Sequence, residues 1–229
     1  MENAILMASG LGKRMRPLTL STPKPLLKVG KTPMIETVIS GLEKRGVDQI
    51  VIVVGYLKEQ FYYLKDKYSN ITFVENTVFE EVNNISSVYA AREWLLKGSC
   101  FVCEADLYVP CASVFQGALS ASCYFGKWVD GYSEDWAFDL DAYDTICRIG
   151  KGGRDCYNMA GVAFFLKEDA KVLHEVIKKE YGQPGYEALF WDDAVNKNIG
   201  QFSLKVHPIG SDQIIELDTV AELARVNTL

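Results

Sequence analysis

Residues 34–54 read M-I-E-T-V-I-S-G-L-E-K-R-G-V-D-Q-I-V-I-V-V, and this segment indicates the class of the fold. Met34 to Arg45 carries apolar residues at helical spacing, and Gly46 follows as a residue suited to a helix end. Gln49 to Val54 is a continuous apolar run, as expected of a strand buried on both faces of a parallel sheet. The segment therefore predicts the helix and the second strand of a βαβ unit.

The same alternation extends in both directions along the chain. The first half is expected to hold further strands at Asn3–Met7, Ile71–Glu75 and from Cys100 to Asp106, and helices at Leu57–Tyr68 and Ser86–Leu96. The second half is expected to hold strands at Cys123–Trp128, Ala137–Asp141 and Gly161–Leu166, and a helix at Lys167–Tyr181. The predicted fold class is α/β, with a Rossmann-like, doubly wound, mostly parallel central sheet and a mixed second half. No linker separates the halves, about 1–110 and 111–229, so we expect a single domain.

Composition argues against several classes of partner. The 229 residues include 24 basic and 30 acidic side chains, for a net charge of −6, and no long run carries one sign, so we expect no nucleic-acid partner. No apolar stretch approaches the roughly 18 residues of a membrane span, and the first residues lack a basic export segment. We therefore expect no membrane partner and a cytoplasmic location. The six cysteines are too sparse for a disulfide scaffold and are expected to be reduced thiols.

A glycine-containing loop follows the first expected strand and reads A-S-G-L-G-K-R-M-R-P-L-T over residues 8–19. Two glycines two positions apart allow positive φ and bring backbone amides close to a polyphosphate, while basic residues add charge. The third glycine of a dinucleotide fingerprint and the G-K-[ST] of a Walker A loop are both missing. A solvated basic turn is the alternative reading of the loop. We predict nucleotide binding by Ala8, Ser9, Gly10, Gly12 and Lys13.

A lysine lies between two prolines in the segment T-P-K-P-L-L, residues 22–27. Because proline restricts the backbone, Lys24 is held in place and can meet phosphate or a negatively charged transition state. Together with the glycine loop, this segment resembles the signature of the sugar-phosphate nucleotidyltransferases, L-x-A-G-x-G-x-R-[LM]-x-P-L-T followed by T-P-K-P-L. Ser9 and Lys13 depart from the usual alanine and the usual threonine or serine of that signature. The resemblance implies catalytic roles for Lys24 and Arg14.

The resemblance also implies a Mg²⁺ cofactor, held by an aspartate at the end of a central strand and by acids near the carboxyl terminus. Asp106 ends the last expected strand of the first half, and Glu216 and Asp218 share one face of an extended segment. We predict that these three residues bind the metal, with Glu104 as a weaker alternative. The competing role for Asp218 and Thr219 is to cap the helix that follows.

Over nearly its full length the chain resembles the bacterial CTP:phosphocholine and 2-aminoethylphosphonate cytidylyltransferases. The shared stretches are residues 54–61 (V-G-Y-L-K-E-Q-F), 83–87 (N-N-I-S-S), 134–136 (E-D-W), 190–192 (F-W-D) and 216–218 (E-L-D). The resemblance implies CTP as one substrate and a small zwitterionic phosphonate or phosphate acceptor as the other. A homodimer is left open.

Aromatic and acidic residues in these stretches suit a cationic acceptor. The candidates for the ring faces are Trp136, Phe190 and Trp191, with a place in the core as the alternative. The candidates for the countercharge are Asp192 and Asp193. A trimethylammonium has no N–H donors, whereas a primary ammonium donates hydrogen bonds to carboxylates. Acids beside aromatic rings therefore favour 2-aminoethylphosphonate over phosphocholine.

Four further residues have weaker assignments. In the glycine-rich stretch 150–154, Lys151 and Arg154 are candidates for the acceptor's phosphate or phosphonate, with an exposed hairpin turn as the alternative. Asn84 and Ser86 are predicted to bind nucleotide oxygens at a helix start, against simple capping of that helix by Asn84.

Other functional classes stay open as alternatives. A sugar-1-phosphate nucleotidyltransferase using UTP, dTTP or CTP is disfavoured because no G-T-[AG] hexose loop follows Asp106. A non-catalytic nucleotide-binding module is disfavoured because the basic and acidic residues of the signature are present. An NAD-dependent oxidoreductase is disfavoured by the incomplete dinucleotide fingerprint.

Overall fold

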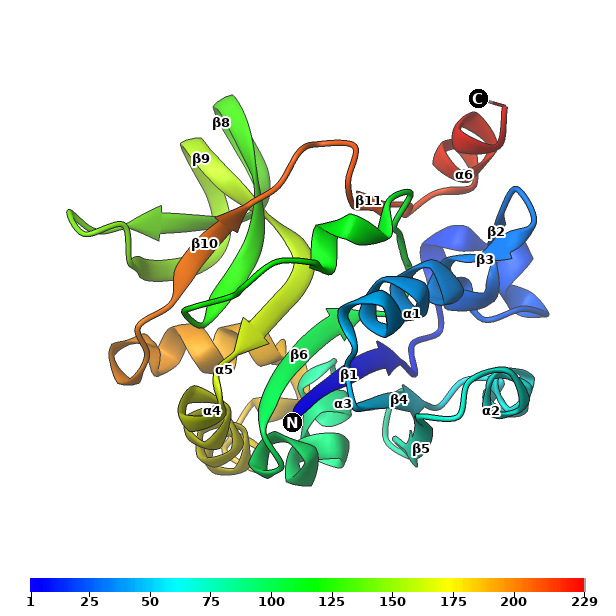
Figure 1. The fold of residues 1–229 in the computed structure, drawn as a ribbon, viewed down its shortest axis with the longest axis horizontal. Coiled ribbons are helices and arrows are strands. Elements are labelled where there is room, and N and C mark those ends of the chain that lie inside the picture. The colour runs from blue at the N-terminus through cyan, green and yellow to red at the C-terminus, as the bar shows by residue number, and fades with distance from the viewer. Residues whose placement is uncertain (229) are drawn as a thin grey trace.

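The computed structural model describes residues 1–228, through which a mixed sheet of seven strands runs in the order β10-β8-β9-β6-β1-β4-β5 (Figure 1). Strands β6, β1, β4 and β5 are parallel, whereas β9 is antiparallel to both β6 and β8. The predicted α/β class is confirmed. The strands are β1 (Glu2–Ala8), β4 (Gln49–Val54), β5 (Ile71–Glu75), β6 (Ser99–Glu104), β8 (Cys123–Leu140), β9 (Ile146–Phe165) and β10 (Lys205–Pro208).

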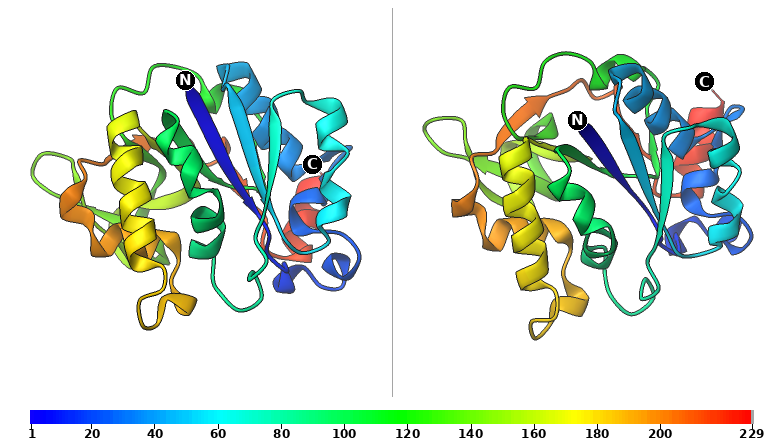
Figure 2. Two further views of the ribbon diagram at one scale, coloured as in Figure 1. Left: turned by 90° about the horizontal axis from the view of Figure 1, so that it is seen from below. Right: turned by 60° about the horizontal axis from the view of Figure 1, so that its bottom comes forward.

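Helices cover both faces of the parallel strands (Figure 2), because neighbouring residues of a strand point to opposite sides. Leu6 belongs to the apolar cluster that includes α1 (Met34–Arg45). The adjacent Ile5 belongs to the cluster formed with α3 (Ile85–Ala91) and α4 (Lys167–Glu180). Strand β1 is therefore buried on both sides at the centre of the sheet, and its carboxyl end leads directly into the glycine loop.

One predicted helix of the first half is wrong. In place of a helix over Leu57–Tyr68, the structure has a 3₁₀ helix at Lys58–Phe61 and a short α2 at Leu64–Lys67. Phe61 and Leu64 are both fully buried, and a spacing of three residues suits a 3₁₀ turn, in which i and i+3 lie above one another. The helix expected over Ser86–Leu96 is present as α3, which tightens into a 3₁₀ helix at Arg92–Leu96.

The second half is built on one long hairpin, which the sequence pattern predicted as three separate short strands. The two strands expected at Cys123–Trp128 and Ala137–Asp141 belong to the single strand β8, and the strand expected at Gly161–Leu166 is the end of β9. Several register shifts along the β8–β9 ladder bend these strands. The shifts interrupt the simple alternation on which the strand prediction depended, which is why the long strands were not recognised.

The end of the chain returns to the glycine-loop side of the sheet. Strand β11 (Ile215–Glu216) pairs with β7 (Leu107–Tyr108), and α6 (Val220–Asn227) follows. Leu217 and Leu223 share an apolar cluster with Met15 from the glycine loop. This packing brings residues more than 190 positions apart in the chain to the same place.

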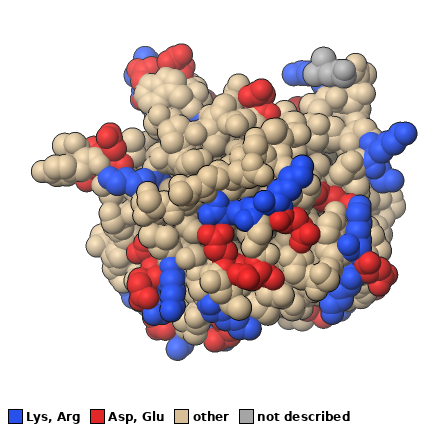
Figure 3. All heavy atoms as spheres, viewed as in Figure 1, with Lys and Arg blue, Asp and Glu red and all other residues tan. Residues whose placement is uncertain are grey.

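The described part of the chain holds no helix long and apolar enough to cross a bilayer. On the face shown in Figure 3, basic and acidic side chains lie next to one another, and neither sign covers a broad area of that face.

We predict that Gly41→Ala destabilises the protein although alanine is the better helix former. A methyl group on Gly41 of α1 would overlap Cδ2 of Phe115, which is buried against other aromatic rings. Overpacking of this kind costs about 1–3 kcal/mol. Urea unfolding measures the loss, and Gly200→Ala is the control, because a methyl group there meets nothing within 4 Å. Equal unfolding midpoints for the two variants would contradict this packing.

Candidate functional site

Two cavities meet at the carboxyl ends of β1 and β6. The first, called the loop cavity, is lined by the glycine loop, Lys24 and the residues around the start of α3. The second, called the hairpin cavity, has a volume of about 400 Å³ and lies against β8 and β9. Arg14, Glu104 and Glu216 line both cavities. Two ligands, one in each cavity, would therefore meet at these three side chains.

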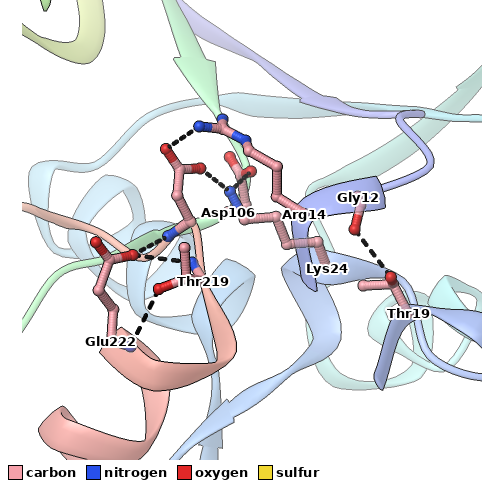
Figure 4. A network of polar contacts seen from close by, with 8 residues as sticks. Gly12, Arg14, Thr19, Lys24, Asp106, Thr219 and Glu222 are labelled. Carbon is pink, nitrogen blue, oxygen red and sulfur yellow. Dashed lines mark hydrogen bonds and ion pairs between the residues drawn. The ribbon is translucent and has the colours of Figure 1, made fainter. Parts of the chain in front are cut away.

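The glycine loop places all of its predicted residues at a cavity. Gly12 takes a φ of 59°, and its carbonyl accepts a 2.8 Å hydrogen bond from Thr19 Oγ1 (Figure 4). A Cβ at Gly12 would lie 3.0 Å from Lys24 Cβ, so glycine also allows close packing there. Of the two glycines that allow a positive φ in this loop, Gly12 adopts one and Gly10 does not. The lining of the loop cavity includes Ala8, Ser9, Gly10 and Gly12, and Lys13 lines an adjoining cavity.

The Lys24 ammonium lies between two of the predicted metal ligands. Its Nζ atom is 2.7 Å from Asp106 Oδ2 and 2.7 Å from Asp218 Oδ1. Arg14 Nη1 lies 2.7 Å from the other oxygen of Asp218 (Figure 4). Burial opposes the positive charge, but the two carboxylates outweigh it and raise the pKa of Lys24. Lys24 is thus a fixed, fully charged cation at the junction of the two cavities.

Two more carboxyl groups, Glu216 and Glu104, give this junction more acidic side chains than cations. Crowding by protein atoms and the neighbouring Asp218 and Asp106 raise the pKa of Glu216 to about 7, although its side chain still reaches solvent. Burial, Asp106 and Glu216 raise the pKa of Glu104 well above its usual value. Oxygen donors in excess of cations are what a divalent metal ion requires, so the donor set fits Mg²⁺.

The predicted metal ligands are brought together, although not as a finished coordination shell. Within residues 1–228 no three His, Cys, Asp or Glu side chains are spaced to hold a metal ion. Lys24 separates Asp106 from Asp218 in this arrangement. Of the two residues considered as caps of the last helix, Thr219 is the one whose side chain caps it, because Thr219 Oγ1 accepts a hydrogen bond from Glu222 N at 3.2 Å. The Asp218 carboxylate is thereby left for the two cations.

A buried polar network supports the floor of the loop cavity. Asn76 Nδ2 donates to Ser86 Oγ at 2.8 Å, and Ser9 Oγ lies 2.8 Å from Ser87 Oγ. All four side chains are buried. Ser86 and Ser9 were predicted from their motifs, whereas Asn76, which follows β5, has no motif to mark it and was missed. Phe79, which also lines this cavity, was missed for the same reason.

Asn84 lines the loop cavity and connects it to the second half of the chain. Its Oδ1 accepts a 2.9 Å hydrogen bond from the backbone N–H of Trp191, the first residue of α5 (Trp191–Lys197). It makes no side-chain capping bond to α3, the helix that it precedes. The alternative, in which Asn84 caps α3, is therefore wrong. The Asn84 side chain instead bonds the start of α5, which lies 107 residues away in the sequence.

The hairpin cavity contains one pair of aromatic rings and several carboxylates. Trp136 and Phe190 meet edge to face, with ring centroids 5.5 Å apart. Trp191 is 3% exposed and stacks on Tyr124, so it lies in the core, which was the alternative to a contact with the acceptor. An aromatic residue at the start of a helix packs equally well into the core, and sequence does not distinguish the two. The carboxylates in this lining are Glu104, Glu134, Asp135, Asp192, Glu216 and Asp218.

Asp192 lies deeper than the sequence suggested. It is 4% exposed and accepts a 3.1 Å hydrogen bond from the Tyr124 hydroxyl. Burial, with the nearby Asp193, raises the pKa of Asp192 to about 7 in spite of that bond. Asp193 does not face the cavity, since its Oδ2 accepts from Phe190 N at 3.0 Å in a capping box.

The two basic candidates near the hairpin separate in the structure. Lys151 lines the hairpin cavity, whereas the exposed Arg154 pairs across the ladder with Tyr132 and is not part of the lining. Residues 150–154 lie inside β9, so the alternative of an exposed hairpin turn is wrong. Asn158 and Met159 of β9 also line the cavity and carry no sequence signal of their own.

Known proteins share both the motifs and the fold. The nucleotidyl transferase family model matches residues 3–115. The 2-aminoethylphosphonate cytidylyltransferase of Lancefieldella rimae is 54% identical over 97% of this chain and 90% of its own length. The choline-phosphate cytidylyltransferase of Streptococcus pneumoniae is 34% identical over 99% and 97% of the two chains. A solved structure of the CTP:phosphocholine cytidylyltransferase from Streptococcus pneumoniae superposes with a TM-score of 0.90, at 32% identity and over 99% and 98% of the two chains.

The chain belongs to the nucleotidyltransferase family, and the prediction of an enzyme of that class is confirmed. Two relatives that match it over nearly its full length are named as cytidylyltransferases, one for 2-aminoethylphosphonate and one for choline phosphate.

We predict that the stability of Asp192→Asn, measured relative to the wild type at the same pH, is higher at pH 8 than at pH 5. The pKa of Asp192 is about 7 in the folded state and near its usual acidic value when unfolded, so the native state binds more protons between these values. Wild-type stability therefore falls as pH rises through this window, by on the order of 3 kcal/mol from this group. Thermal unfolding at both pH values measures the difference, with Asp139→Asn, on the exposed surface of β8, as control. A pH-independent difference for Asp192→Asn would contradict the raised pKa.

Proposed function

We propose that this protein transfers CMP from CTP to a small acceptor that carries a phosphonate or phosphate at one end and an ammonium group at the other. Pyrophosphate is the second product, Mg²⁺ is required, and 2-aminoethylphosphonate is preferred over phosphocholine. The end-to-end similarity to cytidylyltransferases with these two acceptors in their names supports the reaction class.

The observation that carries the proposal is the meeting of the two cavities at Arg14, Glu104 and Glu216. A nucleoside triphosphate suits the loop cavity, whose lining includes the two loop glycines and the cations Arg14 and Lys24. An amine-bearing acceptor suits the hairpin cavity, where six carboxylates and an aromatic pair gather. The reacting ends of both ligands then lie beside Lys24, which also lines the loop cavity.

The transfer is a substitution at the α-phosphorus of CTP. An oxygen of the acceptor's phosphonate or phosphate forms a bond to the α-phosphorus, and the bond from that phosphorus to the bridging oxygen of the β-phosphate breaks. The electron pair leaves with pyrophosphate. Lys24 is suited to stabilise the charge that develops on the α-phosphoryl oxygens, because protein groups already hold it rigidly in place. Arg14, which is more exposed, is suited to guide the triphosphate.

The metal would be held by Asp106, Glu216 and Asp218, and the surplus of carboxylates at the junction supports this assignment. Bound Mg²⁺ would neutralise phosphate oxygens and reduce the repulsion between two anionic substrates.

The composition of the hairpin cavity supports 2-aminoethylphosphonate as the preferred acceptor. With Trp191 in the core, only Trp136 and Phe190 among the candidate aromatics line this cavity, too few rings to enclose a trimethylammonium. Carboxylates are more numerous there, and they accept hydrogen bonds from a primary ammonium.

A matrix of substrates tests the proposal directly. CTP and UTP are each combined with 2-aminoethylphosphonate, phosphoethanolamine, phosphocholine and glucose 1-phosphate, and pyrophosphate release is measured with and without Mg²⁺. We expect release with CTP, Mg²⁺ and the amine-bearing acceptors, fastest with 2-aminoethylphosphonate. Fastest release with glucose 1-phosphate would refute the proposed acceptor class, and equal release without divalent metal would refute the cofactor.

We predict that Lys24→Ala lowers kcat by about a hundredfold or more, because it removes a fixed cation from a site of developing negative charge. Lys28→Ala is the control, since Lys28 is an exposed lysine on β2 (Lys28–Val29), outside both cavities. Steady-state kinetics at saturating CTP measure the effect. A change confined to KM would assign Lys24 to ground-state binding alone.

We predict that Asp106→Asn abolishes turnover while circular dichroism stays native, because the change removes a ligand's charge with little change of shape. Asp212→Asn is the control, because Asp212 is exposed in the segment between β10 and β11. Turnover by Asp106→Asn at the wild-type rate under saturating Mg²⁺ would refute its role as a metal ligand.

A further inference from the structure

An irregularity in β8 turns three consecutive residues toward one cavity. Ser133 pairs with Gly153 and Trp136 with Lys151, so β8 has two residues between its paired positions where β9 has one. This is a β-bulge, and bulges re-aim side chains near binding sites. In a regular strand, neighbouring side chains point to opposite faces. Here Glu134, Asp135 and Trp136 all line the hairpin cavity.

One of the two bulge carboxylates is fastened to the neighbouring strand. Asn158 Nδ2 donates to Ser133 Oγ at 2.8 Å and reaches Asp135 Oδ2 at 3.4 Å. The backbone N–H of Asp135 donates to the same Ser133 oxygen at 3.2 Å. Asp135 is therefore held through both its backbone and its carboxylate. Glu134 makes no side-chain hydrogen bond or ion pair within residues 1–228, so only Asp135 is held in this way.

Asp135 also differs from the other carboxylate near the aromatic pair. Asp192 is buried and already accepts a hydrogen bond from Tyr124. Asp135 lies at the exposed end of the cavity, where its second oxygen, Oδ1, has no partner within residues 1–228. It sits next in sequence to Trp136, whose ring meets Phe190. An ammonium group resting against this aromatic pair would thus have a preset acceptor beside it.

We propose that Asp135, positioned by Asn158 and Ser133, selects acceptors with a primary ammonium over acceptors with a trimethylammonium. This inference rests on the proposed function and assigns the choice of amine to a residue. Asp135 contacts the substrate, whereas Asn158 is a positioning residue that acts through it.

The selection follows from hydrogen-bond chemistry. A primary ammonium donates up to three N–H bonds, whereas a trimethylammonium donates none and gains only general attraction to negative charge. Replacing the carboxylate with an amide removes that attraction for both amines. Only the primary amine also loses a charge-assisted hydrogen bond, which is stronger than a neutral one. The ratio of the two activities, rather than either alone, reports the contact.

The test compares phosphoethanolamine with phosphocholine, which differ only in methylation of the nitrogen. With CTP and Mg²⁺, kcat/KM is measured for both acceptors in the wild type and in Asp135→Asn. We expect the preference for phosphoethanolamine to fall by about fivefold or more in the variant, mainly through KM for the acceptor, with KM for CTP unchanged. An unchanged ratio in Asp135→Asn would overturn the assignment.

Two further variants separate the contact from general effects. Asp139→Asn removes a carboxylate from an exposed position of the same strand, outside the hairpin cavity, and is expected to leave the ratio near the wild-type value. An equal fall of the ratio in this variant would overturn the assignment to Asp135. Asn158→Ala is expected to lower the ratio in the same direction, and to have no further effect on it when combined with Asp135→Asn. Additive effects of the two changes would refute the positioning role of Asn158.

The outcomes also keep the two proposals apart. Absence of pyrophosphate release from CTP with every amine-bearing acceptor refutes the proposed function, and the present inference with it. Release with these acceptors, combined with a ratio that Asp135→Asn does not change, refutes the inference alone.

Discussion

The Lys24 ammonium is the contact on which the arrangement of this site depends. At 2.7 Å from both Asp106 and Asp218, it joins three segments that are distant in sequence: the loop after β1, the end of β6 and the returning carboxyl-terminal segment. Removing the lysine would leave two partly buried carboxylates facing each other without a countercharge, which is far more costly than losing one surface ion pair. Lys24 thus positions the carboxyl-terminal acids as well as serving the proposed chemistry.

The balance of charge around this contact explains why the site has two compartments. In the proposed reaction the triphosphate and the phosphonate are both anionic, so the place where they would meet needs cations, and Lys24 and Arg14 lie there. An ammonium group at the other end of the acceptor needs the opposite environment, and the hairpin cavity supplies carboxylates. Separation along the acceptor's length allows one molecule to be held by charges of both signs.

The two halves of the chain contribute to the site by different physical means. The parallel strands place loops at one edge of the sheet, so the glycine loop and Asp106 arrive together as a consequence of topology. The β8–β9 hairpin contributes through its irregularities, since its bulge turns Glu134, Asp135 and Trp136 into one cavity. Asn84 joins the halves by accepting a hydrogen bond from the first residue of α5.

Sequence alone determined the features that depend on near neighbours. The bounds of α1 and β4, the α/β class and the glycine loop with Lys24 follow from periodicity or from short motifs. The acids at 106, 216 and 218 were predicted from the resemblance to the nucleotidyltransferases. Only the tertiary structure decided which groups those residues face: the burial of Asp192 and Trp191, the exposure of Arg154, the bridge from Lys24 to Asp218, and the bulge at Asp135. The physical reason is the distance along the sequence over which each interaction acts. Helical spacing and turn chemistry act over a few residues, whereas burial, strand register and ion pairing across 194 positions depend on how the whole chain packs.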